Sequence, residues 1–202
     1  MEECVVSAKA QQLKQHLKPG QVYRRAELAQ WSNAVDRHVK QLQNEGSLTR
    51  LSGGLYLCPK ATAFGEAPPE EHTLVKAFLK DSRFLIFSSN LYNTLGLGTT
   101  QLYNETLVYN HKRHGRFVLG ERSFEFCLKP YFPKSLSEEF LLVDMMNNLE
   151  RLAEDKDVLE RLKEKLAKMD SEKLAHTVSD YGNVKTRKFF ATLPGYESLQ
   201  YV

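Results

Sequence analysis

Apolar and polar positions alternate with two different periods in the first sixty residues. Apolar residues recur at helical spacing from Ser7 to Leu17, and Pro19-Gly20 ends that helix. Near the end of this region the period shortens to that of a strand, and Ser52-Gly53-Gly54 supplies a turn. Three helices and a hairpin are therefore predicted, at about 7–17, 24–31, 33–44 and 47–58. This is the order of a winged helix-turn-helix, which we assign to residues 1–60.

The third predicted helix has two chemically different sides. At about 100° per residue, Val35, Val39 and Leu42 fall on one side and would pack on the first two helices. The opposite side carries amide and cationic side chains, the types that pair with base edges in a major groove: Asn33, Arg37, Lys40, Asn44 and the neighbouring Gln41.

Further basic residues flank that helix. Arg50 and Lys60 beside the hairpin are expected to meet phosphates, and Arg24 and Arg25 at the start of the second helix join the predicted DNA-binding set. Exposed helix faces are ordinarily polar, and winged helices also serve as protein–protein modules. DNA contact is favoured because Asp36 is the only acid near this face.

The remainder of the chain predicts a second domain of mixed type. Residues 61–69 have the Gly and Pro content of a linker, and residues 70–202 are interpreted as an α+β domain that becomes a helical tail from about 135. Ser135 to Glu138 fits a capping box at the start of that tail, and Asp144 is expected to be solvated on its first helix. The other predicted elements are a helix at 69–79, a buried strand at 84–87, a short helix at 91–97 and antiparallel strands at 105–110, 116–119 and 123–128.

Residues 111–115 are predicted to turn the first of those antiparallel strands into the second. His111 and His114 are spaced as two metal ligands might be, but Lys112 and Arg113 between them would repel a cation, so no metal site is expected. An exposed basic tip is favoured instead. With Arg116 it forms a second basic patch that would contact phosphate or an acidic partner.

Composition limits the class of protein. Hydrophobic residues make up 42% of the chain and charged residues 26%, enough apolar material for a core. No stretch is long and apolar enough for a membrane span, and the N-terminal residues lack the pattern of a signal peptide. Three scattered cysteines, Cys4, Cys58 and Cys127, are interpreted as structural in a reducing compartment. A cytoplasmic protein is expected.

Charge is uneven along the chain. Residues 1–60 carry a net charge of +4, residues 61–135 carry +2, and residues 136–202 carry −3. A basic N-terminal part is typical of nucleic-acid contact. No nucleotide-binding loop, zinc motif or nucleophile motif is present. We therefore expect neither an enzyme nor a cofactor.

Several segments, in order and spacing, resemble AbiEi-type antitoxins of bacterial type IV toxin–antitoxin systems and the related DUF6088-like family. The first lies in the predicted third helix and hairpin, and the others follow over most of the chain. The matching segments are residues 35–46, 48–51, 53–56, 59–60, 64–69, 93–101, 116–126 and 181–187.

The resemblance implies a two-part protein. Its winged helix would bind operator DNA, expected to be an inverted repeat, and repress its own operon. Its C-terminal domain would antagonise a toxin with a nucleotidyltransferase-like fold, which a type IV antitoxin need not contact directly. By position, the resemblance implies recognition by Asn33, Arg37, Lys40 and Gln41, with Arg50, Ser52 and Gly53 in the wing. A protein-interaction module and a stand-alone winged-helix regulator are the alternatives. The sequence leaves the oligomeric state open.

Overall fold

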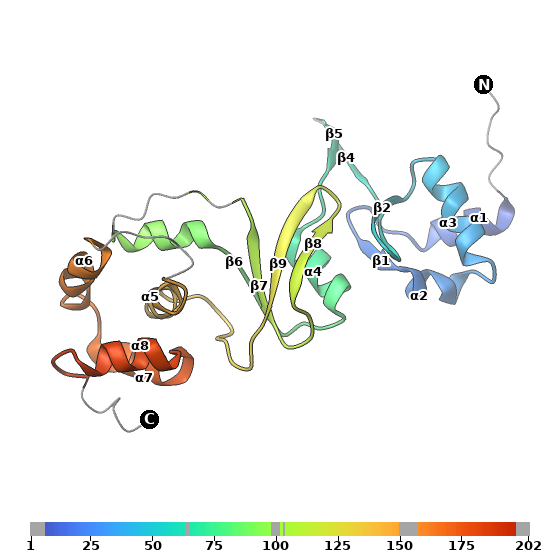
Figure 1. Cartoon of the computed structure of the whole chain (residues 1–202). Helices are drawn as coiled ribbons and strands as arrows, with labels where there is room; N and C mark the ends of the chain where they lie inside the picture. Colours follow the sequence, from blue (N-terminus) through green and yellow to red (C-terminus); the bar gives the residue numbers. More distant parts are fainter. Residues whose placement is uncertain (1–6, 64, 98–101, 103, 150–156, 197–202) are drawn as a thin grey trace. The chain divides into compact units, whose positions relative to one another are not determined.

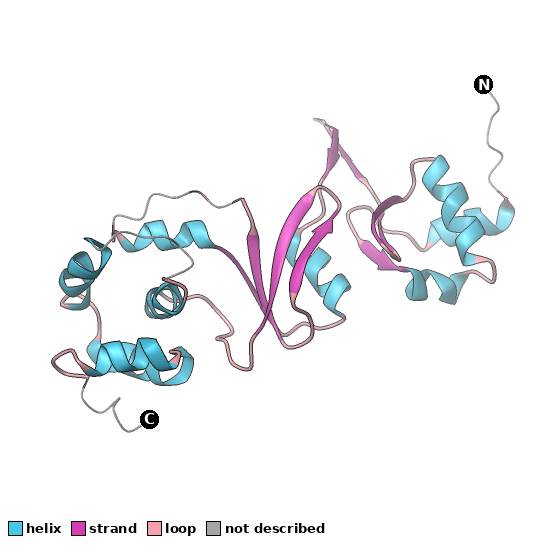
Figure 2. Ribbon diagram, viewed as in Figure 1, coloured by secondary structure: helices cyan, strands magenta, loops and turns pink. Residues whose placement is uncertain are grey.

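The computed structural model describes residues 7–63, 65–97, 102, 104–149 and 157–196, without the side chains of 157–160. Helices and antiparallel strands alternate along the chain, so the predicted α+β class is confirmed (Figures 1 and 2). Contacts divide the chain into two units: Met1–Ser82 with Arg116–Phe124, and Arg83–Gly115 with Glu125–Val202. The prediction divided the chain at 61–69 instead. No helix among the described residues is long and apolar enough to cross a membrane.

The first unit begins with helices packed beside a small sheet. Apolar residues of the helices and the sheet form one cluster, which contains Leu13, Leu28, Val39 and Leu42. The three strands have the order β1-β3-β2 and pair antiparallel. The elements are α1 (Ala8–Gln15), β1 (Val22–Arg24), α2 (Arg25–Leu28), the 3-10 helix η1 (Ala29–Trp31), α3 (Val35–Asn44), β2 (Thr49–Ser52) and β3 (Leu55–Leu57).

The segment predicted as a linker is a hairpin. Its strands β4 (Lys60–Thr62) and β5 (Gly65–Ala67) pair antiparallel, with Lys60 opposite Ala67. No apolar alternation marks these short, exposed strands, and Gly and Pro suit a turn as well as a linker, which explains the difference.

Helix α4 (Glu71–Leu79) belongs to the first unit, although the sequence placed it in the second domain. Its Phe78 packs against Phe117, with ring centroids 5.1 Å apart. Its Glu71 forms an ion pair with Arg122 at 3.1 Å. Both partners come from the Arg116–Phe124 segment, which returns to the first unit from far along the chain.

The four-stranded sheet has an order that differs from the predicted meander. Strand β6 (Phe84–Ser88) pairs antiparallel with β7 (Thr106–Asn110), and Phe84 lies opposite Asn110. The sheet continues as β6-β7-β9-β8, with β8 at Gly115–Leu119 and β9 at Arg122–Leu128. Residues 111–115 therefore do not join neighbouring strands, because β9 lies between β7 and β8. The division between the two units passes through β9.

Helices pack on the second unit's part of the sheet. The 3-10 helix η2 (Ser89–Leu95) follows β6 and ends at Gly96, whose φ of 72° suits a residue without a Cβ. The remaining helices are α5 (Glu138–Asn147), α6 (Asp157–Leu166), α7 (Ser171–Tyr181) and α8 (Val184–Ala191). The cap of α5 is Ser137, which accepts from the Phe140 N–H, and not the predicted Ser135.

The turn between α7 and α8 is fixed by two asparagines and a glycine. Asn147 donates to the Tyr181 carbonyl at 2.9 Å and accepts from the Asn183 N–H at 2.7 Å. A Cβ at Gly182 would lie 2.5 Å from the Val178 carbonyl oxygen. Only glycine fits this approach.

The burial of two cysteines and of one acidic residue bears on their predicted roles. Cys58 and Cys127 are buried as free thiols, and burial raises the pKa of Cys58. Cys4 lies outside the described residues. Asp144, expected to be solvated, is 2% exposed and accepts hydrogen bonds from two tyrosine hydroxyls.

Candidate nucleic-acid interface

Helix α3 is held in the first unit by its apolar side. Val35, Val39 and Leu42 are buried in the cluster that also contains Leu13 of α1. This burial fixes the rotation of the helix about its axis, because the apolar stripe turns inward. The polar positions on the other side are therefore placed at the surface.

The outer surface of α3 presents the side chains that the helical wheel selected. Arg37, Lys40 and Asn44 are exposed along the helix, and Asn33 is exposed just before it. Guanidinium, ammonium and amide groups occur here at about one-turn spacing. We call Asn33, Arg37, Lys40 and Asn44 the α3 face.

Gln41 differs from its predicted role. Its side chain is half-buried, and its Oε1 accepts a hydrogen bond from the Ser7 hydroxyl at 3.0 Å. Ser7 also caps α1 by accepting from the Ala10 N–H. This hydrogen bond connects α3 to the start of α1, because the position of Gln41 on the helix places its side chain next to Ser7. We therefore remove it from the base-reading set.

The one acid within α3, Asp36, is paired inside the first unit. Asp36 accepts two hydrogen bonds from Arg25, from Nε and Nη2, each at 2.6 Å. This bidentate pair lowers the pKa of Asp36, through the hydrogen bond from Arg25, and raises that of Arg25. Arg25 is accordingly occupied in balancing Asp36, and not placed as a separate phosphate contact.

The hairpin carries the remaining residues that were predicted to bind DNA. Arg50 is exposed on β2, and its Nε donates to the Ser52 carbonyl at 3.4 Å. The register between β2 and β3 shifts between Arg50 and Ser52, and exposed Gly53 follows in the turn. The Arg25 N–H donates to the Gly54 carbonyl at 2.9 Å, which ties this turn to α2. Lys60 is exposed on β4.

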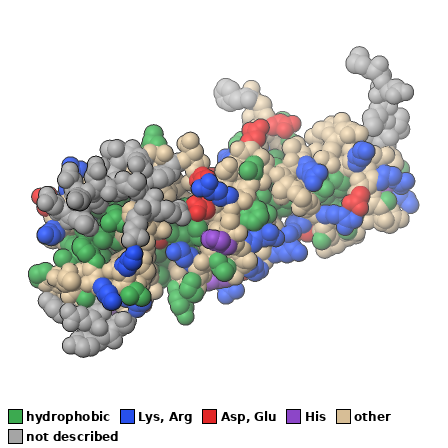
Figure 3. All heavy atoms as spheres, in the orientation of Figure 1, with side chains coloured by type: hydrophobic (Ala, Val, Ile, Leu, Met, Phe, Trp, Pro, Cys, Tyr) green, Lys and Arg blue, Asp and Glu red, His purple; other side chains and the backbone are tan. Residues whose placement is uncertain are grey.

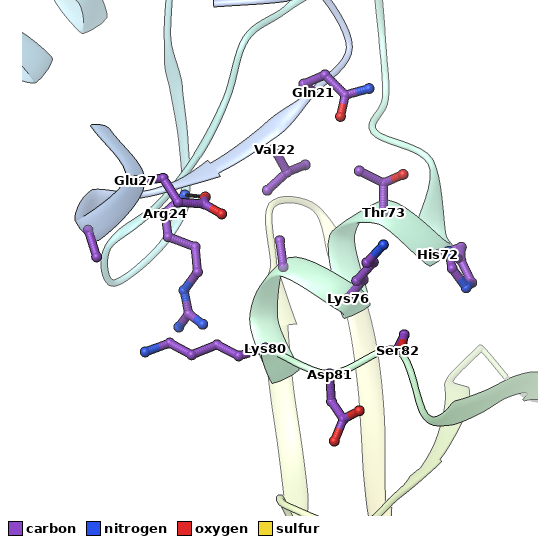
Figure 4. A pocket seen from close by; sticks show the side chains of 12 residues that line it. Gln21, Val22, Arg24, Glu27, His72, Thr73, Lys76, Lys80, Asp81 and Ser82 are labelled. Carbon is purple, nitrogen blue, oxygen red and sulfur yellow. Dashed lines mark hydrogen bonds between the residues drawn. The ribbon is translucent and has the colours of Figure 1, made fainter. Parts of the chain in front are cut away.

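Arg24 belongs to a different surface. It lines a groove of about 780 Å³ between β1, α2 and α4, and Figure 4 shows its guanidinium beside the side chain of Lys80. Lys76 of α4 lies at the same groove. Glu27 in the groove accepts from the Arg24 N–H at 2.7 Å. The structure therefore separates Arg24 from the α3 face.

His38 was missed as a candidate, although its position in the stripe of Val35, Val39 and Leu42 places it on the inner side of α3. The residue is completely buried, and its Nδ1 lies 2.7 Å from the Ser32 hydroxyl. Burial lowers the pKa of His38, and Arg37 and Lys9 add to this effect. Its Nε2 has no hydrogen-bond partner among the described atoms. His38 borders a cleft of about 420 Å³ with Lys9, Gln12, Ala29, Gln30, Trp31, Ser32 and Asn33.

The second basic patch predicted from the sequence does not lie within one unit. Lys112 and Arg113 are exposed in the second unit, and Arg116 is exposed in the segment that belongs to the first. The neighbouring His111 turns toward Phe132, with ring centroids 4.7 Å apart. The turn at residues 111–115 therefore combines exposed cationic side chains with a histidine ring that stacks on Phe132.

The visible surface of the first unit carries Lys and Arg side chains at many points, with few acidic ones between them (Figure 3). This distribution agrees with the net charge of +4 over residues 1–60. Such a surface attracts polyanions at long range. The α3 face is one part of this surface in which cationic and amide groups lie on one helix.

Comparison with known proteins gives one informative similarity. No protein-family model matches the sequence, and no curated protein matches it. The solved structure of the RV2827C protein from Mycobacterium tuberculosis is similar, with a TM-score of 0.56 and 14% identity. The match covers 96% of this chain and 76% of that one. At this identity the similarity establishes a shared fold.

Proposed function

We propose that this protein binds DNA in a sequence-dependent manner through a winged helix-turn-helix, with α3 as the recognition helix and the β2–β3 hairpin as the wing. The α3 face carries the proposal, because its four side chains are exposed while Asp36, the one acid within α3, is held by Arg25. A helix with this chemistry fits the width of a major groove. Arg50 on the hairpin supplies a phosphate contact.

The biological role that we propose is repression by an antitoxin. The sequence resemblance to AbiEi-type antitoxins supports it, and the division into two units agrees with one part for DNA and another for countering a toxin. The operon that the protein represses would then also encode a nucleotidyltransferase-like toxin. The mode of action is binding, without catalysis.

The test is a binding titration of the full chain with the duplex upstream of its own gene, against a scrambled duplex, over a salt series. We expect specific binding that weakens linearly in log salt. Arg37→Ala should cost about 1–3 kcal/mol on the specific duplex if the side chain reads a base. Lys40→Ala should reduce the salt slope by about one if the side chain contacts a phosphate.

Lys163→Ala is the matched control, since Lys163 is exposed on α6 in the second unit and its loss changes the net charge equally. It should leave the specific affinity unchanged. Equal affinity for both duplexes at moderate salt, or an equal loss in Arg37→Ala and Lys163→Ala, would refute recognition by the α3 face.

The antitoxin part is tested separately by growth rescue. Cells that express the neighbouring toxin gene should recover when the full chain is expressed with it. Rescue by an Arg37→Ala chain would show that toxin antagonism does not require operator recognition. Failure of the wild-type chain to rescue would refute the antitoxin role and leave the DNA-binding result standing.

A further inference from the structure

A pocket in the second unit is lined by acceptors and aromatic rings. It encloses about 500 Å³ between the C-terminal turn of α7 and the loop that follows β9. Every lining residue belongs to the second unit. The described residues that line it include no Lys or Arg; they are His111, Pro130, Tyr131, Phe132, Ser179, Asp180 and Tyr181.

The orientation of His111 identifies which of its nitrogens is an acceptor. Its Nδ1 lies 2.9 Å from the Lys129 carbonyl oxygen. A carbonyl only accepts, so Nδ1 carries the proton and donates. Stacking on Phe132, with an angle of 26° between the planes, holds the ring in place. The neutral ring therefore has its lone pair on Nε2, which is available to a hydrogen-bond donor.

Asp180 is unexpected at its position. It lies in the last turn of α7, where the carbonyl end of the helix dipole disfavours a negative charge. No basic residue occupies that turn, and the carboxylate has no ion pair or hydrogen bond within the described part of the chain. A bound cation would be attracted by both the carboxylate and the end of the helix.

The aromatic residues complete the chemistry of the pocket. Tyr131 is 75% exposed, so its ring is accessible to a ligand in this pocket. Tyr181 is fixed edge-on against Phe140, with centroids 5.4 Å apart. Faces of tyrosine and phenylalanine rings attract cations that also carry N–H donors.

We propose that this pocket binds an organic cation with N–H donors, namely a guanidinium or primary ammonium group. Asp180 supplies the counter-charge, His111 Nε2 accepts a hydrogen bond, and the rings of Tyr131 and Tyr181 contact the cation. The group can belong to an arginine or lysine side chain of a polypeptide or to a small amine, and the same pocket chemistry serves both. This site is independent of the α3 face.

The test is calorimetric titration of the full chain at pH 8 with Nα-acetyl-L-arginine amide, with Nα-acetyl-L-citrulline amide as the neutral analogue of the same shape. Acetylation removes the α-ammonium group from both compounds, which are called arginine amide and citrulline amide below. Arginine amide should bind, and citrulline amide should bind at least roughly fivefold more weakly. A short peptide with one central arginine, titrated in parallel, distinguishes the two sources. Tighter binding of the peptide indicates a polypeptide ligand, and equal binding indicates a small amine.

Two variants connect binding to the pocket. Asp180→Asn should weaken binding of arginine amide by about five- to tenfold, and His111→Phe should weaken it while keeping a ring against Phe132. Glu164→Gln, an equal change of charge at an exposed position of α6, should have no effect. Unfolding of Asp180→Asn should occur at the same or a higher denaturant concentration, since the substitution removes an acid from a helix C-terminus. Absence of binding by arginine amide, equal binding of citrulline amide, or unchanged affinity in Asp180→Asn would overturn the proposal.

Discussion

Removing a tyrosine hydroxyl from the buried carboxylate Asp144 should destabilise the second unit strongly. Tyr92 of η2 donates to Asp144 at 2.5 Å, and Tyr109 of β7 donates to its two oxygens at 2.8 and 3.0 Å. All three residues are at most 3% exposed. The cluster therefore joins a strand, a 3-10 helix and α5 inside the core of the second unit.

The size of the effect follows from the charge and burial of the acceptor. A hydrogen bond to a charged group contributes about 1.5–3 kcal/mol, so Tyr92→Phe and Tyr109→Phe should each lower the unfolding free energy by that amount. Because both hydroxyls serve one carboxylate, the double variant should lose more than the sum of the single losses. The second substitution removes the last tyrosine donor from a buried charge.

Tyr109 adds a test by pH. Burial and the neighbouring Asp144 raise its pKa well above the ordinary value of 10.0. A group with a raised pKa in the folded state contributes stability below its unfolded pKa and loses it as the pH rises further. Stability of the wild type should thus fall above about pH 10 more steeply than that of Tyr109→Phe.

The assay is denaturant unfolding followed by far-UV circular dichroism, which reports on the helices of both units, α5–α8 among them. Fluorescence of Trp31, the only tryptophan of the chain, reports on the first unit in the same sample. We expect the circular dichroism transition to shift in the variants. Losses below about 0.5 kcal/mol in both single variants, the range of an ordinary surface substitution, would refute the energetic argument.

Three further predictions concern particular side chains. Gly182→Ala should destabilise the second unit by about 1–3 kcal/mol, measured by denaturant unfolding, since its Cβ would meet a carbonyl oxygen at 2.5 Å. Lowering the pH from about 7 to 5 should destabilise the first unit, since the lowered pKa of buried His38 means that protonation favours the unfolded chain. Denaturant unfolding followed by Trp31 fluorescence should show this loss of stability, and His38→Gln should not show it. Asp36→Ala should raise DNA affinity about two- to fivefold at low salt, with the gain vanishing at high salt, and should leave the unfolding midpoint unchanged.

Local periodicity was sufficient to predict most elements of this fold. The stripe of Val35, Val39 and Leu42 predicted α3 and its buried side, because a helix with one apolar side has few alternatives for packing. The buried strand at 84–87 and the short helix at 91–97 followed from similar local signals. Each of these features depends on residues within about two turns of one another.

The predictions that failed depend on residues far apart in the sequence. Asp144 looked solvated because its partners Tyr109 and Tyr92 lie 35 and 52 positions away. The order of β7, β9 and β8 was missed for a related reason, since hairpin turns predict neighbours in the chain and not a strand inserted between them. The hydrogen bond between Gln41 and Ser7, 34 positions earlier, is likewise a contact that a helical wheel cannot show.

The charge near the α3 face also depends on a residue outside α3, which a reading of that helix alone does not reveal. If α3 is considered without its neighbours, the negative charge of Asp36 weakens the attraction between that helix and phosphate. The bidentate contact with Arg25, 11 positions earlier and on another helix, cancels that charge without using a cation of α3. On the proposal that the α3 face binds DNA, this pairing reduces the repulsion between Asp36 and phosphate, and Asp36→Ala and Arg25→Ala, compared in one salt series, test that effect.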